Sequence, residues 1–137
     1  MLIKFASAYA QWIKNQTNKT NIKITLMLIH FQDESNIHFI YSPHLDLSGY
    51  GKSKNKAVSS FEIVLDDFID YTIKKKTLSK VLKELGWVIK GTNKNPKKLK
   101  APSITDVIKE NDYVSEIFDT YPTNTFHQEI NIPALVQ

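Results

Sequence analysis

The chain has 137 residues, about the length of one domain, and its 42% hydrophobic and 23% charged residues are ordinary for a globular protein and too apolar for a disordered one. It contains no cysteine, which excludes disulfides, thiol nucleophiles and thiolate metal sites and fits a reducing, cytoplasmic location. The net charge of +4 is uneven: residues 52–100 carry +8 (13 lysines against five acids), whereas residues 101–137 carry −5 (one lysine against six acids).

Residues 1–20 have the pattern of an amphipathic helix followed by a polar linker. The expected apolar side carries Leu2, Phe5, Tyr9, Trp12 and Ile13. We expect this helix to pack on the rest of the chain; docking on a partner or on a membrane surface stays open, although two lysines are few for anionic lipid. No apolar run in the sequence reaches the ~18 residues of a membrane span, so we expect no membrane partner.

The next 70 residues read as strand, strand, strand, helix, helix, strand. Ser53 is a suitable N-cap for the first helix, and Gly86 is placed to end the second one. The strands are expected at residues 22–31, 37–41, 45–50 and 87–90, with the helices beginning after Ser53 and after Thr77. This order predicts an α+β fold, in which a three- to four-stranded antiparallel sheet carries helices on one face.

The last third reads as a basic linker at residues 91–100, a helix that begins at Ser103 and is broken near Asn111, and a last short strand at residues 126–132. We therefore divide the chain into an N-terminal helix and linker (1–20), a sheet domain (21–91), and a basic linker with an acidic helical C-terminal appendage (92–137).

Three segments carry a family resemblance. Residues 41–72 (YSPHLDLSGYGKSKNKAVSSFEIVLDDFIDYT) and 77–87 (TLSKVLKELGW) resemble the HicB-like antitoxin family, and residues 128–134 (QEINIPA) look like a tail found in one branch of it. The resemblance implies a fold similar to a degenerate RNase H or double-stranded-RNA-binding core. It also implies binding of a small RNA-cleaving toxin, often with DNA binding by a C-terminal segment.

This sequence departs from the family pattern at two places. Lys56 stands where the family's helix usually has an acidic residue, which leaves the helix capping box incomplete. The acidic last third is also unlike a DNA-binding tail. A helix-turn-helix forced onto residues 103–119 would present a recognition helix without a basic residue, and all 18 basic residues of the chain are lysine. We expect no specific DNA binding; the candidate nucleic-acid patch is Lys94, Lys97, Lys98 and Lys100, with a solvated linker as the alternative.

We expect no catalytic, cofactor or metal site. Asp46 lies on a strand and Asp66, Asp67 and Asp70 on a helix, where their spacing places them opposite the apolar stripe and toward water, so a two-metal nuclease is the weakest hypothesis. Two of the four histidines flank a hairpin and can approach one another, without a third ligand at a convincing spacing. The four are His30, His38, His44 and His127.

The remaining hypothesis is a binding protein. RNA-cleaving toxins are typically basic, and the acidic tail together with the Glu62, Asp66 and Asp70 face can steer such a partner. The candidate interface is Tyr41, Leu45, Asp46, Tyr50 and Trp87, and for its four aromatic or apolar members burial in the core is the alternative. We expect a non-catalytic, homo-oligomeric, HicB-like antitoxin-type protein that sequesters a small basic toxin. The alternative is a stand-alone regulatory or structural homo-oligomer without a toxin or DNA partner.

Overall fold

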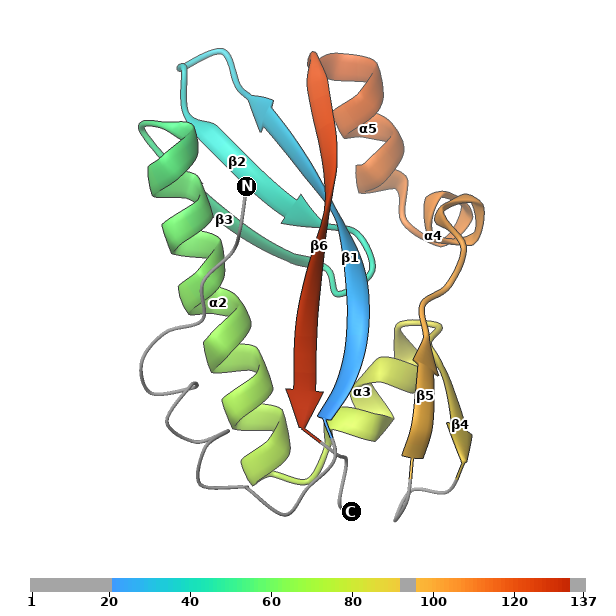
Figure 1. Cartoon of the computed structure of the whole chain (residues 1–137). Coiled ribbons are helices and arrows are strands. Elements are labelled where there is room, and N and C mark those ends of the chain that lie inside the picture. Colours follow the sequence, from blue (N-terminus) through green and yellow to red (C-terminus); the bar gives the residue numbers. More distant parts are fainter. Residues whose placement is uncertain (1–20, 92–95, 134–137) are drawn as a thin grey trace.

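The computed structural model describes residues 21–91 and 96–133; the helix expected within residues 1–20 lies outside these ranges. Within them, four strands form the main sheet in the order β3-β2-β1-β6, and every neighbouring pair is antiparallel (Figure 1). The strands are β1 (Asn21–Gln32), β2 (His38–Ser42), β3 (Leu47–Gly51) and β6 (Thr123–Pro133). The predicted α+β class with an antiparallel sheet is confirmed.

The fourth strand of this sheet comes from the C-terminal end of the described chain. β6 is 11 residues long rather than short, and it pairs with β1 along its whole length, from Asn21 opposite Pro133 to Phe31 opposite Thr123. Ile130 and Ile132 are buried in the same core as the β1 residues they face. Residues 96–133, expected as a linker and an appendage, are therefore integral to the sheet domain.

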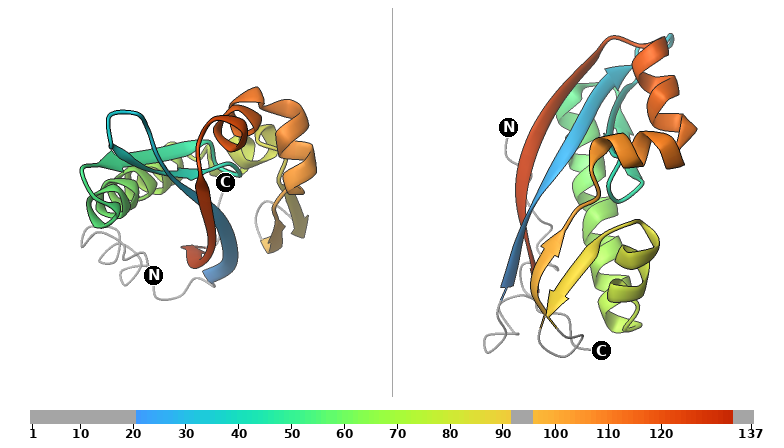
Figure 2. Two further views of the ribbon diagram at one scale, coloured as in Figure 1. Left: turned by 90° about the horizontal axis from the view of Figure 1, so that it is seen from above. Right: turned by 90° about the vertical axis from the view of Figure 1, so that its right-hand side faces the viewer.

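Helix α2 (Lys54–Lys74) covers one face of the sheet, packed on β2 and β3 (Figure 2). The predicted N-cap forms, since the Ser53 hydroxyl accepts a hydrogen bond from the Lys56 backbone N–H at 3.2 Å although no acidic residue occupies the first turn. Its buried face repeats with the helical period, at Ala57, Phe61, Leu65 and Ile69.

The close packing of α2 on β3 depends on a glycine. A Cβ atom built on Gly49 would lie 2.2 Å from the backbone nitrogen of Phe61, so a larger residue cannot occupy the position without displacing the helix. Gly51, at the end of the same strand, also lies against α2, since a Cβ atom there would lie 2.9 Å from the backbone nitrogen of Ala57.

Helix α3 (Leu78–Glu84) follows α2 and ends where predicted, at Gly86, which has a φ of 93° and donates its N–H to the Lys83 carbonyl. The strand expected next exists as β4 (Val88–Gly91), but it lies outside the main sheet. It pairs instead with β5 (Pro96–Lys100) in a separate two-stranded hairpin beside α3 (Figure 1). Half of the expected basic linker is therefore a strand.

Helices α4 (Ile104–Glu110) and α5 (Asp112–Thr120) meet at Asn111, where the break was predicted, and the Ser103 cap also forms. Both helices cover the upper end of the sheet face opposite α2, through Val107, Val114 and Ile117 (Figure 2). This second helical layer was not expected. It accounts for the burial of Ile29, whose neighbour Leu28 faces the α2 side. No helix within the described ranges is both long and apolar enough to cross a membrane.

Candidate functional site

A cleft of about 720 Å³ opens between the β2–β3 turn, the C-terminal end of α3, and α4 with its flanking residues Pro102 and Asn111. The apolar residues that line it come from three separate segments of the chain: Pro43 from the first, Leu85 and the neighbouring Gly86 from the second, and Pro102 and Val107 from the third. Its polar lining is acidic, apart from one amide: Asp46, Glu84, Asp106, Glu110 and Asn111. The volume lies within the range of ordinary ligand pockets.

Asp46 is the most tightly held of these carboxylates. It adopts a φ of 54°, in the left-handed region that aspartate tolerates better than most residues. Its Oδ1 accepts a hydrogen bond of 2.7 Å from the Tyr41 hydroxyl, which itself accepts one of 3.0 Å from the Asn111 side-chain amide. The rim of the cleft is thereby tied to the core of β2 and to the α4–α5 junction.

The Tyr41 hydroxyl is a fixed donor in this network. Burial, and then the hydrogen bond and negative charge of Asp46, raise the pKa of Tyr41 well above its usual value. Asn111 is also fixed, because its Oδ1 caps α5 by accepting the Tyr113 backbone N–H at 3.0 Å. The Asp46 carboxylate is therefore oriented before any ligand arrives.

The cleft has a strong negative charge that neighbouring side chains leave unbalanced. No ion pair among residues 21–91 and 96–133 involves Asp46, Glu84, Asp106 or Glu110. Three further acids, Asp112, Glu116 and Asp119, are exposed on α5, the helix that follows α4 directly. Such a cleft is suited to a cationic group that carries an aliphatic stem.

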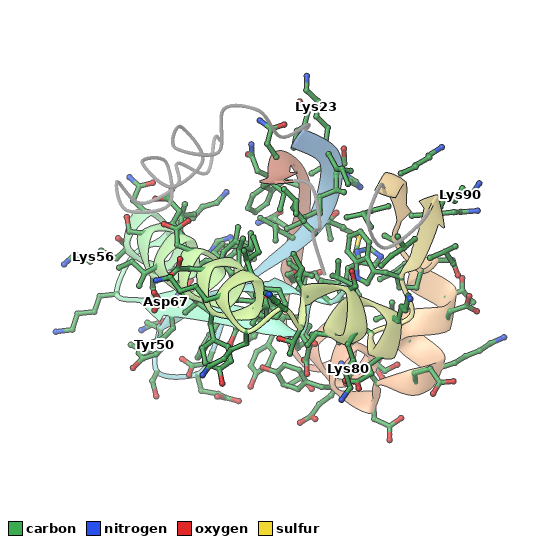
Figure 3. All side chains as sticks on the ribbon, turned by 90° about the horizontal axis from the view of Figure 1, so that it is seen from below. Lys23, Tyr50, Lys56, Asp67, Lys80 and Lys90 are labelled. Carbon is green, nitrogen blue, oxygen red and sulfur yellow. The ribbon has the colours of Figure 1, made fainter. Side chains whose placement is uncertain are left out.

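Of the five residues of the predicted partner interface, three are buried and two are exposed. Tyr41, Leu45 and Trp87 are only 2–3% exposed, so the expectation that they anchor a partner is wrong: they are core residues. Trp87 also donates its Nε1–H to the His44 backbone carbonyl at 2.8 Å, which satisfies its polar atom inside the protein. Asp46 is exposed at the cleft, whereas Tyr50 is 67% exposed on β3 (Figure 3).

The predicted lysine patch is present in part. Lys94 lies outside the described residues, and the backbone of Lys97 belongs to β5. Lys98 and Lys100 are exposed on β5, and Lys90 of β4, which was not predicted, faces Lys98 across the hairpin.

The carboxylates of the nuclease hypothesis do not converge. Asp46 bonds to Tyr41 on the α4–α5 side of the sheet, whereas the aspartates of α2 lie on the other side. Asp67 is exposed (Figure 3), and Asp70 forms an ion pair of 3.0 Å with Lys74. Asp66, in contrast, is only 5% exposed, so the prediction that it lies on a solvated acidic face is wrong. No group of three or more histidines or carboxylates in the described part of the chain is arranged to hold a metal ion.

The predicted approach of two histidines across the β1–β2 hairpin is confirmed. A hydrogen bond of 2.9 Å joins His30 Nε2 and His38 Nδ1, and their rings are stacked. Partial burial, the positive Lys54 and the neighbouring imidazole lower the pKa of His30. His44 is buried against Trp87 and bonds through Nε2 to the Pro102 carbonyl, and burial lowers its pKa too. His127 is exposed on β6.

Sequence reasoning missed Glu84, Asp106 and Glu110 as site residues. The negative charge of the last third was visible in the sequence, but no spacing indicates that α3, α4 and the β2–β3 turn meet. Comparisons with protein-family models, with curated proteins and with solved structures found no match for this chain.

Proposed function

We propose that this protein is a non-catalytic, antitoxin-type binding protein that sequesters a small basic RNA-cleaving toxin by taking a basic segment of it into the acidic cleft. The observation that carries the proposal is the cleft, where four carboxylates without an ion pair in the described chain surround an apolar floor. The resemblance of residues 37–87 to the HicB-like family supplies the class of partner.

The cleft fits a lysine or arginine side chain physically. The aliphatic stem would pack on Pro43, Leu85 and Val107, and the cationic head would lie among the carboxylates. Because Tyr41 already orients Asp46, less side-chain entropy is lost on binding. The acids exposed on α5 would raise the association rate of a basic protein and make that rate fall with salt.

The test removes three of the four negative charges of the cleft with substitutions that keep the size of each side chain. The variant combines Glu84→Gln, Asp106→Asn and Glu110→Gln and leaves Asp46 in place, because Asp46 also holds the fold. The matched control combines Glu34→Gln, Asp67→Asn and Glu129→Gln, three exposed acids that belong neither to the cleft nor to α5, so it removes the same charge elsewhere.

We expect the native host to yield a small basic protein that co-purifies with the wild-type chain, inhibits growth when expressed alone, and is neutralised by co-expression of the chain. The affinity of the purified pair should fall at least tenfold in the cleft variant and little in the control. The proposal fails if no such protein is recovered, or if the cleft variant binds and neutralises it as well as the wild type does.

A second candidate, a stand-alone homo-oligomer, is favoured by the free side of β6, which within the described chain pairs with β1 alone. Pairing with a second copy about Gln128 would set Phe126 opposite Ile130, and His127 opposite Glu129, of that copy. Light scattering should then give a dimer that Glu129→Lys dissociates and Glu116→Lys does not. A monomer at about 100 μM would exclude it.

A further inference from the structure

The hairpin formed by β4 and β5 has two very different faces. The inward face packs Ile89 and Leu99 against the main core. The outward face, here named the lysine face, consists of Val88, Lys90, Lys98 and Lys100, all exposed. Figure 3 shows Lys90 extending from the hairpin away from the rest of the molecule.

The lysine face is electrostatically unfavourable for folding. Lys90 lies directly opposite Lys98 in the strand register, and Lys100 follows on the same face about 7 Å further along β5. Like charges directly opposite one another destabilise a strand pair. No carboxylate in the described part of the chain forms an ion pair with these three lysines. Because the core needs only Ile89 and Leu99 from the hairpin, the fold gives no reason for the lysines.

We propose that the lysine face binds the phosphodiester backbone of nucleic acid without sequence preference. Ammonium groups act as point charges that neutralise phosphates and release counterions. The face has no aromatic side chain to stack on a base, and the chain has no arginine to read a base edge with a paired contact. Val88 is its one apolar side chain, which is too little to insert into a lipid surface.

This proposal goes beyond the toxin-binding function and does not depend on it, because the lysine face and the acidic cleft share no residue. Binding of nucleic acid to the lysine face should be weak, electrostatic and steeply dependent on salt concentration. Three neutralised phosphates predict a slope of about −2.7 in a plot of log affinity against log salt concentration, which is about a 40-fold loss of affinity between 50 and 200 mM salt.

The experiment measures fluorescence anisotropy of a labelled 20-base-pair DNA duplex of mixed sequence, with the full chain added at 50–200 mM salt. The variant combines Lys90→Gln, Lys98→Gln and Lys100→Gln. The control combines Lys74→Gln, Lys75→Gln and Lys76→Gln, three exposed lysines at the end of α2. We expect the variant to lose at least tenfold in affinity at 50 mM salt and most of the salt slope, and the control to lose less than threefold.

Folding is checked in the same samples, since relief of the Lys90–Lys98 repulsion predicts a variant at least as thermally stable as the wild type. Lys98→Glu is the second variant, because it places opposite charges across the strands while removing affinity for phosphate. The proposal is overturned by equal losses in variant and control, by no wild-type binding at 50 mM salt, or by binding to phosphatidylserine vesicles without binding to the duplex.

Discussion

The Tyr41 hydroxyl connects three parts of the molecule that the chain brings together from a distance. It donates to Asp46 on the rim of the cleft and accepts from Asn111 at the α4–α5 junction. Tyr41→Phe removes this one oxygen. The ring stays packed in the core of the α4–α5 side, in edge-on contact with Tyr113.

The expected cost follows from what each partner loses. Asp46 is exposed, so water replaces much of its lost hydrogen bond, and this half costs about 1 kcal/mol. The Asn111 amide is partly buried and loses its acceptor, which costs about 1 kcal/mol more. Tyr41→Phe should therefore lower the free energy of unfolding by about 2 kcal/mol, or the melting temperature by about 6–10 °C.

Urea denaturation followed by circular dichroism measures this change. Tyr50→Phe is the control, because its hydroxyl lies on an exposed side chain and its loss should cost less than about 0.5 kcal/mol. A double-mutant cycle with Asp46→Gly, which accepts the positive φ, should give a coupling energy of about 1 kcal/mol. Wild-type stability in Tyr41→Phe, or no coupling in the cycle, would refute the proposed link between cleft and core.

Three further predictions test the fold. Gly49→Ala should lower the free energy of unfolding by at least about 3 kcal/mol in a denaturant titration, because its Cβ would overlap the α2 backbone. Ser48→Ala on the same strand is the control and should leave the stability almost unchanged. Equal losses of stability in the two variants would count against the close approach of α2 to β3. Ile130→Ala should cost about 2–4 kcal/mol in one cooperative transition, and a separate early transition would show that β6 is not part of the core. The folded protein lowers the pKa of His30 and His44 below 6.5, so the unfolded chain binds protons at these two residues more readily. The free energy of unfolding should therefore fall as the pH drops through 6.5. A free energy of unfolding that does not change between pH 8 and pH 5 would contradict this.

Most of the local elements could be predicted from short-range patterns in the sequence. Ser53, Ser103 and Gly86 predicted helix ends correctly, because a cap is a contact between residues three or four apart. The period of apolar residues likewise located every described strand except β5, and the buried face of α2 except Asp66, since it depends on the geometry of a single element. The close pairing of His30 and His38 was predictable for the same reason: they flank one hairpin.

The tertiary structure alone decided which elements pair and which residues are buried. β6 joins β1 across about a hundred residues of chain, while β4 leaves the main sheet for β5, and both choices depend on long-range packing that no local pattern encodes. The same packing buries Tyr41 and Trp87, which composition alone made plausible anchors. It also gathers the cleft carboxylates from the β2–β3 turn, α3 and α4. Two of the four cleft carboxylates, Asp106 and Glu110, belong to the acidic last third of the sequence, but their meeting with Asp46 and Glu84 is a property of the fold.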